Sequence, residues 1–337
     1  MGFFPLILVL EKGAFVMRVL SGIQPSGNLH LGNYFGMMKR MIEYQKNQEL
    51  FCFIVNFHAL TSVFDADRLR HQTCEAVRDF LALGLDPDKS IFWVQSDVPE
   101  VTELTWFLSN VTGMGLLERS HSYKDKLAKG IPASHGLFAY PVLMAADILG
   151  YGANIVPVGK DQKQHVEIAR DIAARFNNTY GETFIIPEPD IEDDLATIPG
   201  LDGQKMSKSY GNTIEIFIDE ASLKQKIMTL KTDSTPVDEP KPIEGNILFS
   251  LYSLFLDDQG KEELKDRFLT PGLKYGEVKK ELFKIIWEYF APYREKRSKI
   301  SKSEVAEVMK KGAEKARAVI TEYLDRARHN VGIDYYR

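Results

Sequence analysis

Residues 17–33 read MRVLSGIQPSGNLHLGN, which joins a short apolar run to a glycine-rich turn and the start of a helix. We predict a strand over residues 17–23 and a helix over residues 34–44. A helix N-terminus presents free backbone N–H groups to an anion, and glycine lets a ligand approach the backbone closely. The stretch therefore predicts a cradle for a phosphate or nucleotide, although an ordinary strand-to-helix turn would have a similar composition.

The glycine spacing of this turn excludes two common nucleotide motifs. It does not match the dinucleotide fingerprint GxGxxG, and it lacks the Gly-Lys-Ser/Thr of a P-loop. The kind of nucleotide site must therefore be inferred from the rest of the chain.

Outward from this turn, short apolar runs alternate with longer helical patterns. Further strands are predicted over residues 50–55, 91–94 and 155–158. Further helices are predicted over residues 68–84, 102–109, 137–150 and 162–176. This order is typical of an α/β fold with a doubly wound, mostly parallel, Rossmann-like sheet. The loops after the four strands should share one edge of the sheet, where such folds bind ligands.

The second half of the chain has a different character. Residues 178–200 are rich in Pro, Asp and Glu and are predicted to be a connection. Residues 221–328 carry repeated helical patterns, which predict a second, smaller, all-helical domain. We predict an extension over residues 1–16 that precedes a second candidate start at Met17. A catalytic domain over residues 17–210 and about 315–337 and a helical domain over residues 211–314 complete the division.

Composition limits the class of protein. The 337 residues carry a net charge of −5 and only two cysteines, Cys52 and Cys74. There is no global basic field of the kind that marks a nucleic-acid binder, and a disulfide scaffold or cysteine-rich zinc site is excluded. The apolar run at residues 3–10 is too short to span a bilayer and lacks the features of a signal peptide. We predict a cytoplasmic protein without membrane association.

Residues 205–209 read KMSKS and follow a glycine-bearing turn. Lysine offers a mobile point charge and serine adds neutral donors, so this lysine loop could follow negative charge onto a leaving pyrophosphate. A solvated surface turn is the alternative interpretation.

Asp147 lies in an otherwise apolar helical stretch, residues 140–149. A carboxylate there is costly unless it is paired or used. Asp147 therefore either lies on an exposed turn of the helix or accepts a hydrogen bond from a ligand.

The histidines show no metal-binding spacing, and no metal site is predicted. Core or surface roles are expected for His58, His71, His121, His135 and His165. No Ser-His-Asp or Cys-His constellation can be assigned.

Two of these motifs resemble the signatures of the class I aminoacyl-tRNA synthetases. KMSKS is intact at residues 205–209, whereas His30-Leu31-Gly32-Asn33 has Asn in place of the last His of the other signature. The lead-in at residues 21–27 and the runs at residues 140–148 and 156–165 are similar to those of tryptophanyl-tRNA synthetases. The resemblance extends from about Met17 to the C-terminus, and four separated motifs in the same order make it specific.

The resemblance implies that ATP activates L-tryptophan to tryptophanyl-adenylate with release of pyrophosphate, followed by transfer to tRNA(Trp) for protein synthesis. Such activation needs positioning and charge stabilisation rather than a covalent nucleophile. It also implies Mg²⁺ bound with ATP, without a dedicated protein site. A helical domain that recognises the anticodon and a homodimer whose tRNA spans both subunits are further expectations.

The same resemblance implies three sets of site residues. The catalytic set is Gln24, His30, Lys205 and Lys208. The ATP-binding set is Gln24, Pro25, Ser26, Gly32, Asn33, Gly159, Lys160, Asp161, Ile198, Lys205, Met206, Ser207, Lys208 and Ser209. The tryptophan-binding set is Ile23, Tyr140, Met144, Asp147 and Gln162. Asp147 would accept the indole N–H, which can only donate. The family commonly has Glu where this chain has Lys160, so the role of that side chain stays open.

Three alternatives to this function are a tyrosyl-tRNA synthetase, a small-molecule adenylyltransferase and an inactive RNA-binding paralogue. The run at residues 159–165 and the Gly32-Asn33 ending argue against the first, the long helical part against the second, and the intact lysine loop and cradle against the third. Basic clusters at residues 123–126, 296–302 and 310–317 could contact tRNA phosphates or belong to solvated helix faces.

Overall fold

The computed structural model describes residues 16–25, 27–120, 123–124, 130, 134–159, 162–191 and 198–336. At its centre lies a sheet of five parallel strands in the order β3-β2-β1-β4-β5. The strands are β1 (Arg18–Ile23), β2 (Glu49–Ile54), β3 (Ile91–Val94), β4 (Ile155–Val158) and β5 (Glu188–Ile191). The four predicted strands and the doubly wound parallel sheet are confirmed. The strand order reverses between β1 and β4, the kind of switch point at which such sheets bind ligands.

The prediction of a connection over residues 178–200 is wrong for β5. This strand reads Glu-Pro-Asp-Ile, and Pro189 is tolerated because β5 lies at the edge of the sheet. Arg40 Nη2 lies 2.6 Å from Asp190 Oδ2, so an ion pair from the first helical stretch holds a strand that lacks an apolar pattern.

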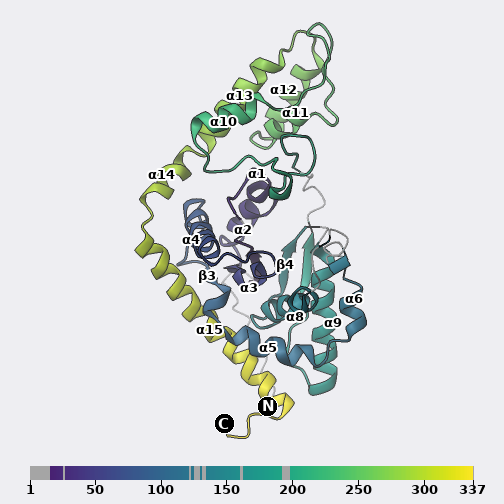
Figure 1. Cartoon of the computed structure of the whole chain (residues 1–337), viewed down its shortest axis with the longest axis vertical. Coiled ribbons are helices and arrows are strands. Elements are labelled where there is room, and N and C mark those ends of the chain that lie inside the picture. The colour runs from purple at the N-terminus through teal and green to yellow at the C-terminus, as the bar shows by residue number, and fades with distance from the viewer. Residues whose placement is uncertain are drawn as a thin grey trace.

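Helices cover both faces of the sheet (Figure 1). Those of the first half are α1 (Leu31–Asn33), α2 (Lys39–Tyr44), α3 (Asn56–Ala59), α4 (Ala66–Ala82), α5 (Glu100–Ser109), α6 (Met114–Glu118), α8 (His135–Leu149) and α9 (Lys163–Tyr180). The predicted helices are confirmed with small shifts at their ends. The first one starts earlier than predicted, at Leu31, and continues through a π-helical segment, η1 (Tyr34–Met38), into α2.

The sheet buries side chains on both faces because side chains alternate along a strand. On β2, Leu50, Cys52 and Ile54 belong to one buried cluster, whereas Phe51 and Phe53 belong to the other. The first cluster includes residues of α4 and of the first helical stretch, and the second includes residues of α5, α8 and α9. Such a continuous apolar run is typical of a parallel strand that is covered on both faces.

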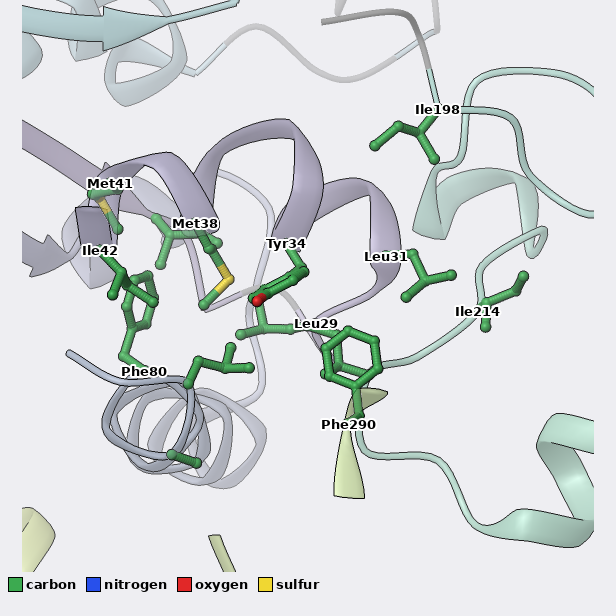
Figure 2. Packing of buried hydrophobic residues seen from close by; sticks show 14 of the residues in the cluster. Leu29, Leu31, Tyr34, Met38, Met41, Ile42, Phe80, Ile198, Ile214 and Phe290 are labelled. Carbon is green, nitrogen blue, oxygen red and sulfur yellow. The ribbon is translucent and has the colours of Figure 1, made fainter. Parts of the chain in front are cut away.

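A smaller helical region follows the lysine loop and lies at the top of Figure 1. Its helices are α10 (Glu220–Met228), α11 (Ile247–Ser253), α12 (Asp258–Leu269), α13 (Tyr275–Tyr289) and α14 (Ala291–Lys299). Figure 2 shows Leu29, Leu31 and Tyr34 gathered around Phe290, the residue that joins α13 to α14. The rings of Tyr34 and Phe290 meet edge to face at 5.2 Å. The helical region is therefore seated on the cradle end of the sheet through a shared apolar cluster.

The last helix, α15 (Lys302–Val331), returns along β3, at the other edge of the sheet (Figure 1). A β-carbon at Gly312 would lie 1.6 Å from Phe92 O, so this glycine lets the helix backbone touch the strand. Ala313, Ala316 and Ile320 are buried beside it. The helix thereby covers an edge that would otherwise expose backbone hydrogen-bonding groups.

We expect Gly312→Ala to lower the free energy of unfolding by about 1–3 kcal/mol, because the new methyl group pushes α15 off β3. Gly276→Ala, in the first turn of α13 with open space around it, is the matched control and should be neutral or slightly stabilising. Guanidinium unfolding followed by circular dichroism measures both variants. Equal stability of the two would show that the close approach is unimportant.

Candidate active site

The glycine-rich turn after β1 is held against the segment that follows the lysine loop. Leu31 N–H donates to Ile214 O at 2.9 Å, and Ile216 N–H donates to Leu29 O at 3.0 Å. Gly27 has a φ of 115°, a conformation that only glycine adopts at low cost. The conformation of the turn is therefore defined by a glycine and by backbone hydrogen bonds to a distant part of the chain.

The two signature motifs meet at the N-terminus of the first helical stretch. Gly32 N–H donates to Met206 Sδ at 3.3 Å, and Lys208 Nζ donates to Gly27 O at 3.0 Å. A β-carbon at Gly32 would lie 2.9 Å from His30 Nδ1 and 3.3 Å from Met206 Cβ, so the glycine makes room for both side chains. The lysine loop thus docks on the cradle, and Lys208 already points its ammonium group at the turn.

The lysine loop is braced by Asn212, a buried residue that the sequence did not single out. Ser207 N–H donates to Asn212 Oδ1 at 2.8 Å, and Asn212 Nδ2 donates to Asp202 Oδ1 at 2.7 Å. The hydroxyls of Ser207 and Ser209 lie 2.8 Å apart. Lys205 is exposed, whereas Lys208 is half-buried and opens a short 3₁₀ turn, η4 (Lys208–Tyr210).

Burial sets the charge states of this group. It lowers the pKa of Lys208 to about 8, and the Asp79 carboxylate opposes that fall. Burial and the nearby Lys208 charge together lower the pKa of His30 to about 4. At neutral pH Lys208 is therefore mostly a cation and lies beside a neutral His30 imidazole.

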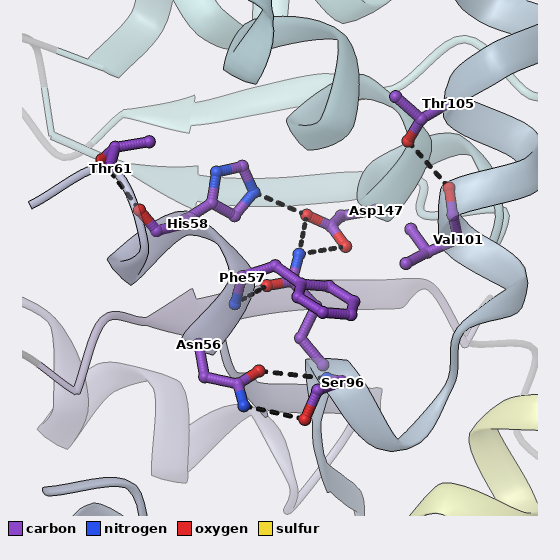
Figure 3. A network of polar contacts seen from close by, with 9 residues as sticks. Asn56, Phe57, His58, Thr61, Ser96, Val101, Thr105 and Asp147 are labelled. Carbon is purple, nitrogen blue, oxygen red and sulfur yellow. Dashed lines mark hydrogen bonds and ion pairs between the residues drawn. The ribbon is translucent and has the colours of Figure 1, made fainter. Parts of the chain in front are cut away.

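A second group of polar residues surrounds Asp147 in α8 (Figure 3). Only 2% of Asp147 is exposed, so the alternative of an exposed helix turn is excluded. His58 Nε2 lies 2.9 Å from Asp147 Oδ2, and Gln95 Nε2 lies 2.9 and 2.8 Å from the two carboxylate oxygens. Burial raises the pKa of Asp147, and these hydrogen bonds oppose the rise. A carboxylate has about four acceptor sites, so one remains for another donor.

His58 and Gln95 come from the loops after β2 and β3, two of the four loops that the sequence placed at one edge of the sheet. Phe57 N–H donates to Gln95 Oε1 at 3.0 Å, which turns the amide N–H₂ of Gln95 toward Asp147. His58, which the sequence treats as a core or surface residue, is a buried member of this site. The polar loops after β2 and β3 indicated both residues in the sequence. Their distance from Asp147 along the chain gave no indication that they contact it.

Most of the remaining predicted site residues lie in the described part of the chain. Tyr140 lies two turns before Asp147 on α8, and its hydroxyl lies 2.8 Å from His165 Nε2. Ile23 ends β1, Met144 is half-buried on α8, and Gln162 N–H donates to Gly159 O at 2.9 Å. Pro25 and Ile198 are buried, Gln24 is exposed, and Asn33 Oδ1 accepts from His30 N–H at 3.3 Å. Ser26, Lys160 and Asp161 lie outside the described residues.

In the part of the chain that the structure describes, no group of three or more His, Cys, Asp or Glu could hold a metal ion. Within the same part, no helix is long and apolar enough to cross a membrane.

The family model described as tRNA synthetases class I (W and Y) matches residues 14–291. A tryptophan–tRNA ligase of Fusobacterium nucleatum is 54% identical over 319 residues, covering 94% of this chain and 98% of that protein. The chain belongs to the tryptophan–tRNA ligase family. The predicted family and the prediction of an aminoacyl-tRNA synthetase are thereby confirmed.

Solved structures of tryptophan–tRNA ligases have the same fold. The tryptophanyl-tRNA synthetase of Campylobacter jejuni, crystallised with ADP and tryptophan, is 51% identical with a TM-score of 0.87, covering 94% of this chain and 100% of that one. The enzyme of Mycoplasma pneumoniae is 29% identical with a TM-score of 0.80, covering 94% and 98%.

His30 should make this ligase less stable in acid. The pKa of His30 is about 4 in the folded protein, against 6.5 for an ordinary histidine. Between these pH values the unfolded chain binds a proton at this residue and the folded protein does not, which favours unfolding. Stability from this residue is complete above pH 6.5 and is lost as the pH falls toward 4. His30→Asn should flatten that part of the pH profile of the thermal midpoint, whereas His135→Asn, at an exposed position, should leave it unchanged. An unaltered slope in His30→Asn would contradict the assignment.

Proposed function

We propose that this synthetase activates L-tryptophan with ATP, releases pyrophosphate and transfers the tryptophanyl group to tRNA(Trp). The observation that carries the proposal is the docking of the lysine loop on the glycine-rich turn, where Lys208 meets Gly27 O. The Campylobacter jejuni structure, which contains ADP and tryptophan, supports a nucleotide and an amino acid as the two ligands of this fold.

Adenylate formation requires charge stabilisation at the leaving group. A carboxylate oxygen of tryptophan attacks the α-phosphorus of ATP, the bond to the β-phosphate oxygen breaks, and negative charge moves onto pyrophosphate. Lys208 and Lys205 would follow that charge, with the Lys208 ammonium exchanging Gly27 O for phosphate oxygens. The positive charge that this step requires is present below pH 8, the approximate pKa of Lys208.

The nucleotide would lie against the first helical stretch. Its phosphates would contact Gln24, Pro25, Ser26, Gly32 and Asn33, together with Met206, Ser207 and Ser209 of the lysine loop. The adenosine side would contact Gly159, Lys160, Asp161 and Ile198. The glycine-rich turn and the helix N-terminus supply backbone N–H groups for the phosphates.

Tryptophan would be selected by Asp147, which accepts the indole N–H. A buried carboxylate held by His58 and Gln95 has a defined direction, and a site built around one hydrogen bond rejects analogues that lack the donor. Tyr140 and Gln162 would hold the α-amino group, while Met144 and Ile23 would form pocket walls.

Mg²⁺ would arrive as the ATP complex, and the enzyme would act as a cytoplasmic homodimer with the helical region at the anticodon. The division into a catalytic domain (residues 17–210 and about 315–337) and a helical domain (residues 211–314) remains part of this proposal. Some basic residues already have partners within the chain: Lys311 pairs with Glu307, and Arg317 pairs with Glu100. Arg317 therefore has a structural role on α15, whichever surface the tRNA uses.

Amino-acid-dependent exchange of pyrophosphate into ATP tests the function directly. Exchange with tryptophan is expected, and exchange with tyrosine alone would replace the proposed specificity with that of the sister enzyme. Failure with every amino acid would show that the chain is no activating enzyme.

Lys208→Ala should lower the exchange rate by roughly 10²–10³-fold, because its contact grows as charge develops on the leaving group. Tryptophan affinity, measured by calorimetry, should change far less. Lys224→Ala, on an exposed position of α10, serves as the control. A change confined to tryptophan affinity would refute the role given to Lys208.

Asp147→Asn should lower the preference for tryptophan over benzothienylalanine, in which sulfur replaces the indole N–H, by at least about tenfold. Competition in the exchange assay gives the ratio of kcat/KM values. Asp171→Asn, at an exposed position of α9, should leave that ratio unchanged. If Asp147→Asn also leaves it unchanged, Asp147 does not read the indole nitrogen.

A further inference from the structure

Arg297, in α14, reaches from the helical region to α4 on the catalytic half. Its Nε lies 2.6 Å from Asp79 Oδ1, and its Nη2 lies 2.6 Å from Glu75 Oε2. The guanidinium group also lies over the ring of Phe217, 4.9 Å from its centroid. Only 8% of the Asp79 side chain is exposed, so the contact is largely shielded from water.

Helix α4, which Arg297 contacts, also contacts the glycine-rich turn. In the amide orientation that satisfies both ends of its side chain, Gln72 donates to Pro25 O at 2.8 Å and accepts from Arg68 Nε at 3.1 Å. A cleft of about 560 Å³ lies between the turn, α4 and α14. Its lining includes Gly27, Asn28, Gln72, Glu75, Asp79 and Arg297. The ion pair therefore borders the same turn whose carbonyl receives Lys208.

Asp79 also acts on Lys208 through its charge. Burial raises the pKa of Asp79 to about 6 although Arg297 opposes the rise, so Asp79 is ionised in the pH range in which Lys208 titrates. Its carboxylate favours the charged form of Lys208. Other charged or titratable groups around this pair include Glu75, Arg78, Arg297 and His30. The same cleft is also lined by His71, Glu215, Asp219 and Lys226.

We propose that Arg297 is a positioning residue for adenylate formation. By joining α14 to α4, Arg297 sets the position of the glycine-rich turn and of the Asp79 carboxylate, whose negative charge acts on Lys208. The inference rests on the proposed role of Lys208 at the leaving pyrophosphate. Helix α14 continues directly from α13 of the helical region. In this proposal, the contact between the helical region and α4 is therefore part of the nucleotide site.

A purely stabilising ion pair would behave differently. Buried ion pairs contribute little net stability, and removing one partner chiefly leaves an uncompensated charge. If Arg297 only stabilised the fold, its loss would lower the unfolding temperature without changing which protonation state of Lys208 prevails.

The test uses Arg297→Gln, Asp79→Asn and the control Arg267→Gln, which breaks an exposed ion pair with Glu281 inside the helical region. Tryptophan-dependent exchange is measured in the full chain at saturating tryptophan. Arg297→Gln should raise the KM for ATP by about tenfold, because misplacement far from the reacting atoms carries penalties of up to about a hundredfold. Arg267→Gln should leave it unchanged. Equal KM values for the two variants would overturn the proposal.

The pH profile of kcat/KM for ATP reports the pKa values of essential groups in the free enzyme. A purely structural role of Arg297 would leave those pKa values unchanged. Asp79→Asn removes a carboxylate that favours the Lys208 cation, so the alkaline limb should move down by roughly half a pH unit to one unit. Arg297→Gln removes the cation that is paired with Asp79 and Glu75, so it should also move the limb. Arg297→Lys, which keeps the charge, should leave the limb at the wild-type pH. An unmoved limb in Asp79→Asn or in Arg297→Gln would overturn the proposal.

Two outcomes separate this inference from the proposed function. If wild-type protein exchanges with tryptophan and Lys208→Ala is slow, but Arg297→Gln and Asp79→Asn behave as wild type, only the positioning role fails. If wild-type protein shows no exchange, or Lys208→Ala is unimpaired, the proposed function itself fails.

Discussion

The backbone of Gly32 lies directly against Met206, and the arrangement of the proposed nucleotide site depends on this contact. The two residues are 174 positions apart, yet the Gly32 N–H donates to the methionine sulfur. A β-carbon at residue 32 would crowd the His30 imidazole at 2.9 Å and Met206 Cβ at 3.3 Å, so this close approach requires glycine. Backbone hydrogen bonds of Leu31 and Leu29 with Ile214 and Ile216 join the same turn to the segment after the lysine loop. Lys208 is therefore delivered to the cradle by packing, and its charge is available where a polyphosphate would lie.

The surroundings of Asp147 suit the selective role that we propose for it. An ionised carboxylate that is 2% exposed is expensive unless its oxygens are satisfied. Here the amide of Gln95 and the imidazole of His58 satisfy them through hydrogen bonds. An arginine partner would occupy both oxygens through a bidentate pair. The milder partners leave acceptor capacity, which suits a donor-only ligand group such as an indole N–H.

Apolar packing and ion pairs both join the helical region to the catalytic half, and they have different roles. The aromatic cluster around Tyr34 and Phe290 buries apolar surface, which supplies non-directional stabilisation. The pairs of Arg297 with Glu75 and Asp79 add direction, because two hydrogen bonds from one planar guanidinium define an orientation. Together they place α14 beside α4 and so beside the glycine-rich turn.

The sequence by itself determined the elements whose causes are local. Apolar runs and helical periodicity located β1 to β4 and many of the helices, and four separated motifs indicated the nucleotide chemistry and the family. Only the tertiary structure decided the rest. Strand β5 has no apolar pattern of its own; it pairs with β4 and contacts Arg40 through Asp190. His58 and Gln95 lie 89 and 52 positions from Asp147, and Arg297 lies 218 from Asp79. Such partners are brought together by strand order and helix packing, which no single stretch of the chain encodes.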